Sequence, residues 1–170
     1  MRVFSAALLC AAFLVVPVTG QGLSGRRAPS FSIPDSALNQ HDLLDYRGHW
    51  LILDFMQTNC PHCKALSKTL EEVKTRYGPK VATVSVVVPP DTMATVAKYI
   101  QENKITATIV FDSGQVAMSY FKATPSRPGF DTPHWFAINP AGMIVRDWGQ
   151  NSADSQDWVK EFDQLVAGTK

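Results

Sequence analysis

Residues 58–64 read TNCPHCK, which places Cys60 and Cys63 two residues apart with Pro61 and His62 between them. Two cysteines at this spacing can hold a metal ion, close a short disulfide-bonded turn or exchange electrons as a dithiol. A structural bridge would constrain the unfolded chain very little, because little loop-closure entropy is removed by so short a loop. We therefore interpret the pair as chemical rather than structural.

The residues on either side of the pair predict a strand that leads into a helix. Residues 50–56, WLILDFM, form a nearly continuous apolar run, which is typical of a central strand covered on both faces. After Cys60, apolar residues recur with the spacing of one helical face, at Leu66, Leu70, Val73 and Tyr77. Gly78-Pro79 predicts the end of this helix. Cys60 is thus expected at a strand-to-helix junction, with Asn59 as the N-cap.

A thiol in the first turn of a helix has a specific chemistry. Unpaired backbone N–H groups and the helix dipole favour an anion there, so we expect Cys60 to be a thiolate that attacks disulfides at neutral pH. Pro61 is tolerated in the first turn, and Cys63, one turn on, would resolve the mixed disulfide. We expect His62 to face the sulfurs and to stabilise the thiolate, which makes the disulfide a stronger oxidant.

The N-terminal segment predicts export. Residues 1–20 carry one positive charge, Arg2, followed by an apolar run over 3–18 that includes Cys10. This layout is typical of a secretory signal peptide cleaved before Gln21, and the apolar run is short for a transmembrane helix. We expect a periplasmic or extracellular protein, with membrane attachment only if the segment is retained as an anchor.

Length and composition are those of one globular domain. The chain has 170 residues, 45% of them hydrophobic and 18% charged, with a formal net charge of +1. No basic run appears, which excludes a nucleic-acid-binding surface of the usual kind. Residues 21–30, QGLSGRRAPS, are small, polar and basic, and we interpret them as a flexible leader. Residues 31–170 are expected to form the domain.

The rest of the chain alternates strands with helices. Further strands are predicted over 81–88 and 108–112, with a hairpin over 134–149 and a loop over 123–133. Helices are predicted through Met93–Ile100, Val116–Phe121 and Trp158–Val166. This order predicts an α/β fold, a central mixed sheet with parallel strands, helices on both faces and the hairpin as an antiparallel edge.

The stretch ILDFMQTNCPHCK resembles the active-site strand and helix of the thioredoxin superfamily, with Asp54 six residues before Cys60. The Pro-His pair is the one found between the cysteines of DsbA-type oxidants. The order of elements is similar to that of TlpA/ResA-like extracytoplasmic thioredoxins, which carry an extra strand–helix insertion that residues 81–112 match. Their G-x-P-T-x-F-x-I-D-x-x-G-x-I segment is echoed by DTPHWFAINPAGMI, residues 131–144.

The resemblance implies roles for individual residues. Pro133 would be a cis-proline packed against the cysteines, and the backbone of Thr132 would pair with an extended client chain. Asp54 would be a buried proton acceptor for Cys63. The implied activity is thiol–disulfide exchange between the cysteine pair and client proteins, without a prosthetic group or metal, with a membrane redox partner that recycles the enzyme.

Two departures and two alternatives accompany this interpretation. Asn59 replaces the usual Trp before the first cysteine. Leu66 stands three residues after the second cysteine, where the reductants that act on apocytochromes carry an acid, and this weakens the case for an apocytochrome substrate. A copper metallochaperone could combine the cysteines with His62, His134 or His49. A peroxiredoxin-type thiol peroxidase is the other alternative. The Pro-His pair favours oxidation of clients, whereas the order of elements favours reduction.

Overall fold

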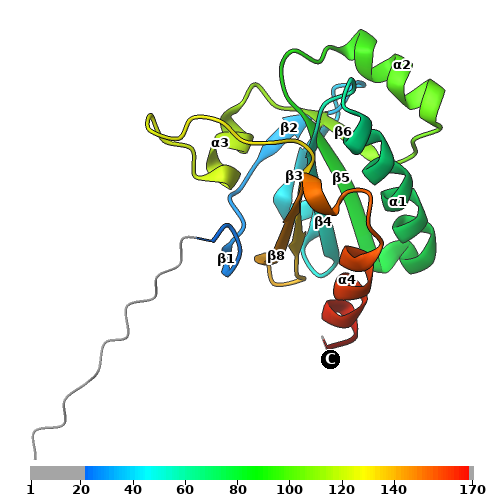
Figure 1. Ribbon diagram of the computed structural model, residues 1–170, viewed down its shortest axis with the longest axis vertical. Coiled ribbons are helices and arrows are strands. Elements are labelled where there is room, and N and C mark those ends of the chain that lie inside the picture. Colours follow the sequence, from blue (N-terminus) through cyan, green and yellow to red (C-terminus); the bar gives the residue numbers. More distant parts are fainter. Residues whose placement is uncertain (1–21, 169–170) are drawn as a thin grey trace, which may run out of the picture.

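A six-stranded mixed sheet forms the centre of the computed structural model, which describes residues 22–168. In spatial order the strands are β1 (Arg26–Arg27), β8 (Met143–Gly149), β7 (His134–Ile138), β4 (Trp50–Met56), β5 (Val81–Val87) and β6 (Thr108–Phe111). β4, β5 and β6 run parallel, and β7, β8 and β1 add antiparallel pairs on the other side of β4 (Figure 1). The predicted mixed sheet is confirmed.

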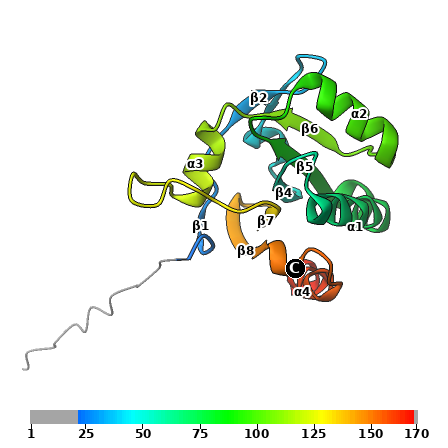
Figure 2. The ribbon, with the colours of Figure 1, turned by 45° about the horizontal axis from the view of Figure 1, so that its top comes forward.

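Within the described residues, four α-helices cover the two faces of this sheet: α1 (Pro61–Tyr77), α2 (Met93–Asn103), α3 (Gln115–Phe121) and α4 (Asp157–Gly168). Leu51, Leu53 and Phe55 of β4 pack on the side of α3. Ile52 packs with α1 and α4, and Met56 packs with α2 and the start of α1. Neighbouring strand residues point to opposite faces, and helices cover both faces (Figure 2). All of β4 is therefore buried, as its continuous apolar run predicts.

The predicted strand–helix insertion is present as β5, α2 and β6. β5 pairs in parallel with both β4 and β6, so the insertion widens the parallel half of the sheet. α2 begins after Thr92, whose side chain accepts a hydrogen bond from the backbone N–H of Thr95 in a capping box. The insertion therefore lies beside the carboxyl end of β4, where the cysteine pair follows.

The N-terminal part of the described chain differs from the flexible leader expected over 21–30. β1 pairs with β8 at the edge of the sheet, and Arg26 donates a hydrogen bond from Nη2 to the carbonyl oxygen of Tyr120. Ala28 is only 3% exposed. Backbone pairing needs no apolar side chain, so a small, basic segment can still form an edge strand. The hairpin is consequently not the edge of the sheet, because β1 covers β8. The signal peptide expected over 1–20 lies outside the described residues.

A second small feature went unpredicted, a two-stranded sheet made of β2 (Ser32–Pro34) and β3 (Gln40–Asp42), followed by a 3-10 turn at Leu43–Tyr46. Its strands are three residues long and largely polar, too short for an alternating pattern to appear. Two further 3-10 turns lie at Gly78–Lys80 and Gln150–Ser152. None of the helices described between residues 22 and 168 has the length and apolar character needed to cross a bilayer.

Candidate active site

Cys60 occupies the N-cap position of α1, where β4 ends and the helix begins. Its Sγ accepts a hydrogen bond from the backbone N–H of Cys63 at 3.1 Å, and Pro61 opens the helix. The expected N-cap, Asn59, is wrong by one residue, because the sulfur itself takes the place of the capping oxygen. An amide N–H aimed at Sγ at the positive end of the helix dipole stabilises a thiolate there.

Cys63 differs from Cys60 in its exposure. It is fully buried, whereas Cys60 is partly exposed, and the two cysteines are not bridged. Burial raises the pKa of the Cys63 thiol well above its usual range, and the neighbouring Cys60 and Asp54 raise it further. The partly exposed sulfur is therefore the one that a partner can reach, and the buried one holds its proton more tightly.

The loop before β7 reaches the same sulfur. The Thr132–Pro133 peptide bond is cis, as the resemblance implies, and Pro133 is buried. The Sγ of Cys60 lies 3.8 Å from the carbonyl oxygen of Thr132. The structure thus brings Thr132 and Pro133 to the cysteine pair, which lies about seventy positions earlier in the chain.

Asp54 lies under the motif, on the face of β4 that packs against α1. It is completely buried, and the Oγ of Ser85 donates a hydrogen bond to its Oδ2 at 3.3 Å. Its Oδ1 has no hydrogen-bond partner among residues 22–168. Burial raises the pKa of Asp54 to about 8, and the Ser85 hydrogen bond offsets part of that rise. A carboxyl with this pKa can both give and take a proton near neutral pH.

His62 lies differently from the expectation that it faces the sulfurs. The hydrogen bond that its ring makes is from Nδ1 to Oδ2 of Asp154, at 2.7 Å, and the two side chains are 42% and 62% exposed. Asp154 lies just before α4, 92 residues along the chain. This contact turns the ring toward the segment before α4 rather than toward the sulfurs.

Two of the histidines considered as metal ligands, His49 and His134, lie away from the cysteines. His49 precedes β4, whose seven residues separate it from the cysteine pair by roughly 20 Å, and its Nδ1 bonds the carbonyl oxygen of Pro79. His134 pairs in register with Phe55 and packs against aromatic rings on the α3 side of the sheet, opposite Cys63. Across the described part of the chain, no three His, Cys, Asp or Glu side chains are placed to share a metal ion.

The comparisons with known proteins agree with this geometry. Residues 24–147 match the model of the AhpC/TSA family. The chain belongs to this family. No curated protein sequence matches it.

Solved structures with the same fold have low sequence identity to this family member. A protein from Neisseria meningitidis assigned as a thioredoxin superposes with a TM-score of 0.67 at 21% identity, covering 85% of this chain and 93% of its own. The thioredoxin domain of a thiol-disulfide oxidoreductase from Bacteroides vulgatus gives 0.66 at 20% identity, with 82% and 96% covered. BsSco, a member of the Sco family of cytochrome c oxidase assembly proteins, gives 0.67 at 17% identity, with 85% and 95% covered.

The family match and these superpositions confirm the predicted fold and class. The AhpC/TSA chain has a thioredoxin-like fold and is a thioredoxin-like oxidoreductase with a Cys-x-x-Cys pair. Two residues of the site were not singled out from the sequence. Ser85 is visible there only as a polar residue within the apolar run VATVSVVV, and nothing in the sequence connects Asp154 with His62.

Proposed function

We propose that this protein is an extracytoplasmic thiol–disulfide oxidoreductase that exchanges its Cys60–Cys63 dithiol or disulfide with cysteines of client proteins. The observation that carries the proposal is the position of the Cys60 sulfur. It caps α1, accepts the N–H of Cys63 and lies 3.8 Å from the carbonyl oxygen of Thr132, while remaining partly exposed. That arrangement suits a nucleophilic thiolate beside a backbone edge to which a client strand can add.

The exchange proceeds through a mixed disulfide. A client thiolate attacks the Cys60 sulfur of the oxidised pair, the Cys60–Cys63 bond breaks, and the sulfur of Cys63 leaves as a thiolate. Asp54, with a pKa of about 8, holds a proton at neutral pH and transfers it to Cys63. A second client thiolate then attacks the client sulfur of the mixed disulfide and releases Cys60 as a thiolate. The client is oxidised and the enzyme is reduced by two electrons.

The same steps in reverse reduce a client disulfide. The Cys60 thiolate attacks one sulfur of the client disulfide, and the other client sulfur leaves as a thiolate. Cys63 then gives its proton to the Asp54 carboxylate and attacks the Cys60 sulfur, which closes the Cys60–Cys63 disulfide and releases the second client thiolate. The reduction potential of the pair decides the direction in the cell. A value near about −120 mV is that of a strong oxidant, and one near about −270 mV is that of a reductant.

Trapping of mixed disulfides tests the proposal. Cys63→Ser leaves an attacking thiol that cannot be released by internal resolution, so we expect it to accumulate adducts with exported proteins that disappear on reduction. Cys60→Ser is the matched control and should trap none. The proposal is overturned if the two variants give the same non-reducing gel pattern.

Assays on the purified protein distinguish client exchange from the two other activities considered from the sequence, thiol peroxidase and copper metallochaperone. A peroxidase would turn a hydroperoxide into an alcohol while Cys60 becomes a sulfenic acid, which Cys63 converts to a disulfide with release of water. A metallochaperone would bind one equivalent of copper tightly. We expect client exchange to be faster than peroxide consumption, and we expect copper to bind without fixed stoichiometry.

Export and recycling are part of the proposal. They are supported by the charged-then-apolar pattern of residues 1–20 and by the need to restore the pair after each turnover. Fractionation of cells that produce the full chain, beside a chain lacking residues 1–20, should place only the full chain outside the cytoplasm. Cross-linking through Cys63→Ser should also capture a membrane redox protein.

A further inference from the structure

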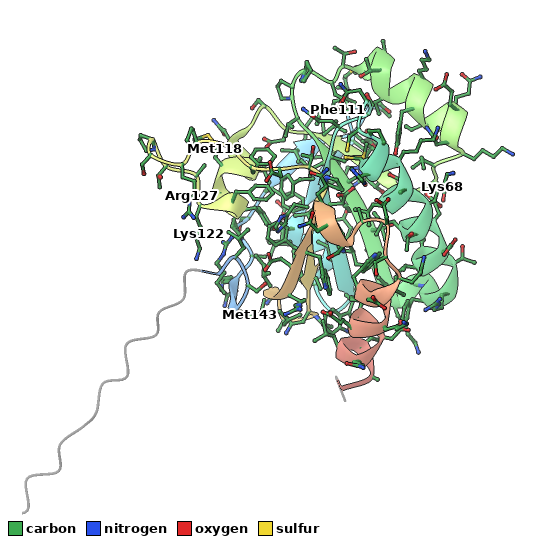
Figure 3. The ribbon with its side chains drawn as sticks, in the orientation of Figure 1. Lys68, Phe111, Met118, Lys122, Arg127 and Met143 are labelled. Carbon is green, nitrogen blue, oxygen red and sulfur yellow. The ribbon has the colours of Figure 1, made fainter. Side chains whose placement is uncertain are left out.

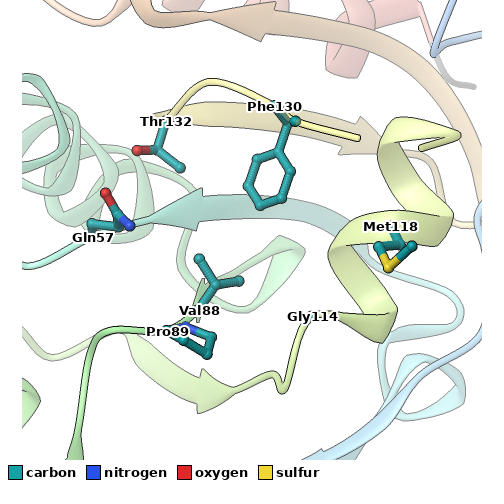
Figure 4. Close-up of a pocket in the computed structure, with 8 residues that line it drawn as sticks. Gln57, Val88, Pro89, Gly114, Met118, Phe130 and Thr132 are labelled. Atoms are coloured by element: carbon teal, nitrogen blue, oxygen red, sulfur yellow. The ribbon is translucent and has the colours of Figure 1, made fainter. Parts of the chain in front are cut away.

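An apolar pocket of about 330 Å³ opens beside the cysteine pair (Figure 4). Eight residues from four separate segments line it. They include Gln57 after β4, Val88 after β5, Met118 on α3, and Phe130 and Thr132 in the loop before β7. Figure 4 shows Phe130 and Val88 reaching into it from opposite sides, with Met118 at one end and Gln57 and Thr132 at the other.

Two of the lining residues connect the pocket to the reactive sulfur. The carbonyl oxygen of Thr132 lies 3.8 Å from the Cys60 Sγ, and the carbonyl oxygen of Gln57 accepts a hydrogen bond from the Cys60 backbone N–H at 3.2 Å. The pocket is therefore continuous with the backbone edge on which the proposed function places the client chain. A side chain close to the client's reacting cysteine is within reach of it.

The lining selects for an uncharged, apolar occupant. None of the eight residues carries a charge, and the polar groups stand at the end next to Cys60. Phe130 stacks on Phe121 with ring centroids 4.3 Å apart and an interplanar angle of 4°, which fixes one wall. Met118 is 53% exposed, and Figure 3 shows it on α3 on the same side of the molecule as Arg127 of the following loop. A flexible thioether at the rim adapts to differently shaped apolar groups.

We propose that this pocket, called here the Met118 pocket, binds an apolar side chain located within two residues of the client's reacting cysteine. The proposal rests on the proposed function, because it names the class of client that the exchange selects. The client pairs as an extended strand with the Thr132 backbone, its cysteine faces Cys60, and its large apolar neighbour leaves water for the pocket. Clients with a charged or small residue there react more slowly.

Single-turnover kinetics with short peptides test this inference. The protein is the full chain with Cys10→Ser and Cys63→Ser, so that Cys60 is its only thiol. Each peptide carries one cysteine as a mixed disulfide with 5-thio-2-nitrobenzoate in a Gly/Ser background. The Cys60 thiolate attacks the peptide sulfur, the peptide–Cys60 disulfide forms, and the coloured aryl thiolate leaves. Leu is placed in turn at each of the two positions on either side of the cysteine.

At one or more placements, we expect Leu to raise the rate constant about tenfold over the all-Gly/Ser peptide, a usual effect of filling a hydrophobic pocket. Asp at the same placement should give no gain. Met118→Lys should reduce the Leu-to-Gly/Ser ratio to about one, because it places a charge at the rim. Met93→Lys is the matched control, since Met93 is an exposed methionine on α2 outside the pocket, and it should keep the ratio of the parent protein.

The possible failures are distinguishable. Equal rate constants for all peptides, or a Leu preference that survives Met118→Lys, would overturn the pocket assignment while leaving thiol–disulfide exchange intact. A parent protein that fails to react even with a small aryl disulfide would overturn the proposed function and the pocket with it. A preference that appears only after removal of residues 1–21 would show that the pocket binds the chain's own N-terminal segment, which also overturns the assignment to a client.

Discussion

Replacing Asp54 by Asn should change the pH dependence of stability more than any other single substitution near the motif. Asp54 is completely buried, and within residues 22–168 its one hydrogen bond comes from the Ser85 hydroxyl to one carboxyl oxygen. Asn has nearly the same shape, can accept the same hydrogen bond and has no charge at any pH. The substitution therefore removes the titration of this group and leaves the packing of β4 against α1 in place.

The magnitude follows from the two pKa values of the Asp54 carboxyl. In the unfolded chain the group has its ordinary pKa of 3.8, and in the folded protein burial raises the pKa to about 8. Because the folded-state value is higher for an acid, the unfolded state releases the proton first, and the free energy of unfolding falls as the pH rises between these values. Each pH unit contributes about 1.4 kcal/mol, so the loss over this window is about 6 kcal/mol.

Urea unfolding of the reduced proteins across this pH range measures the effect. The free energy of unfolding of Asp54→Asn minus that of the wild type should increase by about 6 kcal/mol between about pH 4 and about pH 8 and then level off. Asp131→Asn is the control, since Asp131 is exposed, and its difference should stay within about 0.5 kcal/mol. A difference between Asp54→Asn and wild type that does not change with pH would refute the reasoning.

Three further predictions concern the residues around the motif. His62→Gly should make the reduction potential of the cysteine pair more negative by at most about 30 mV, or a tenfold change in the equilibrium constant, because the ring lies next to the pair in the chain but is hydrogen-bonded to Asp154. Equilibration with glutathione buffers measures this, and a potential equal to that of a His49→Gly control would contradict it. Ser85→Ala should raise the pKa of Asp54 further, because the hydroxyl no longer stabilises the carboxylate. The pH profile of mixed-disulfide resolution should then move up by about one pH unit. A profile that stays in place or moves down would be inconsistent with the hydrogen bond. Ala28→Asp should lower the free energy of unfolding by about 3 kcal/mol or more, because it buries a charge beside β1. Arg27→Ser is the control, since Arg27 is exposed, and it should change the free energy of unfolding little. Equal, small changes in urea unfolding for the two variants would restore the interpretation of 21–30 as a flexible leader.

Some parts of the fold follow from the sequence because the signals are local. The seven apolar residues of β4 identify a strand buried on both faces, and Gly78 ends α1 where the periodicity stops. The spacing of Cys60 and Cys63 after that strand indicates redox chemistry, and the resemblance adds Asp54 and the cis bond before Pro133, which the structure shows in those places. Composition and periodicity depend on neighbouring residues only, so they can be interpreted without knowing the fold.

Other parts depend on which segments meet, and the tertiary structure alone decides them. The register of β4 and β5 brings Ser85 to Asp54, and the position of α4 brings Asp154 to His62. Pairing with β8 turns a polar N-terminal stretch into a strand. The face of β7 directs His134 away from the cysteines, and the Met118 pocket needs four segments at once. The sequence by itself determined the reactive cysteine pair and the strand and helix that hold it, because local patterns encode them. The groups that tune the pair, and the surface beside it, came only from the tertiary structure, because contacts between distant segments leave no local pattern in the chain.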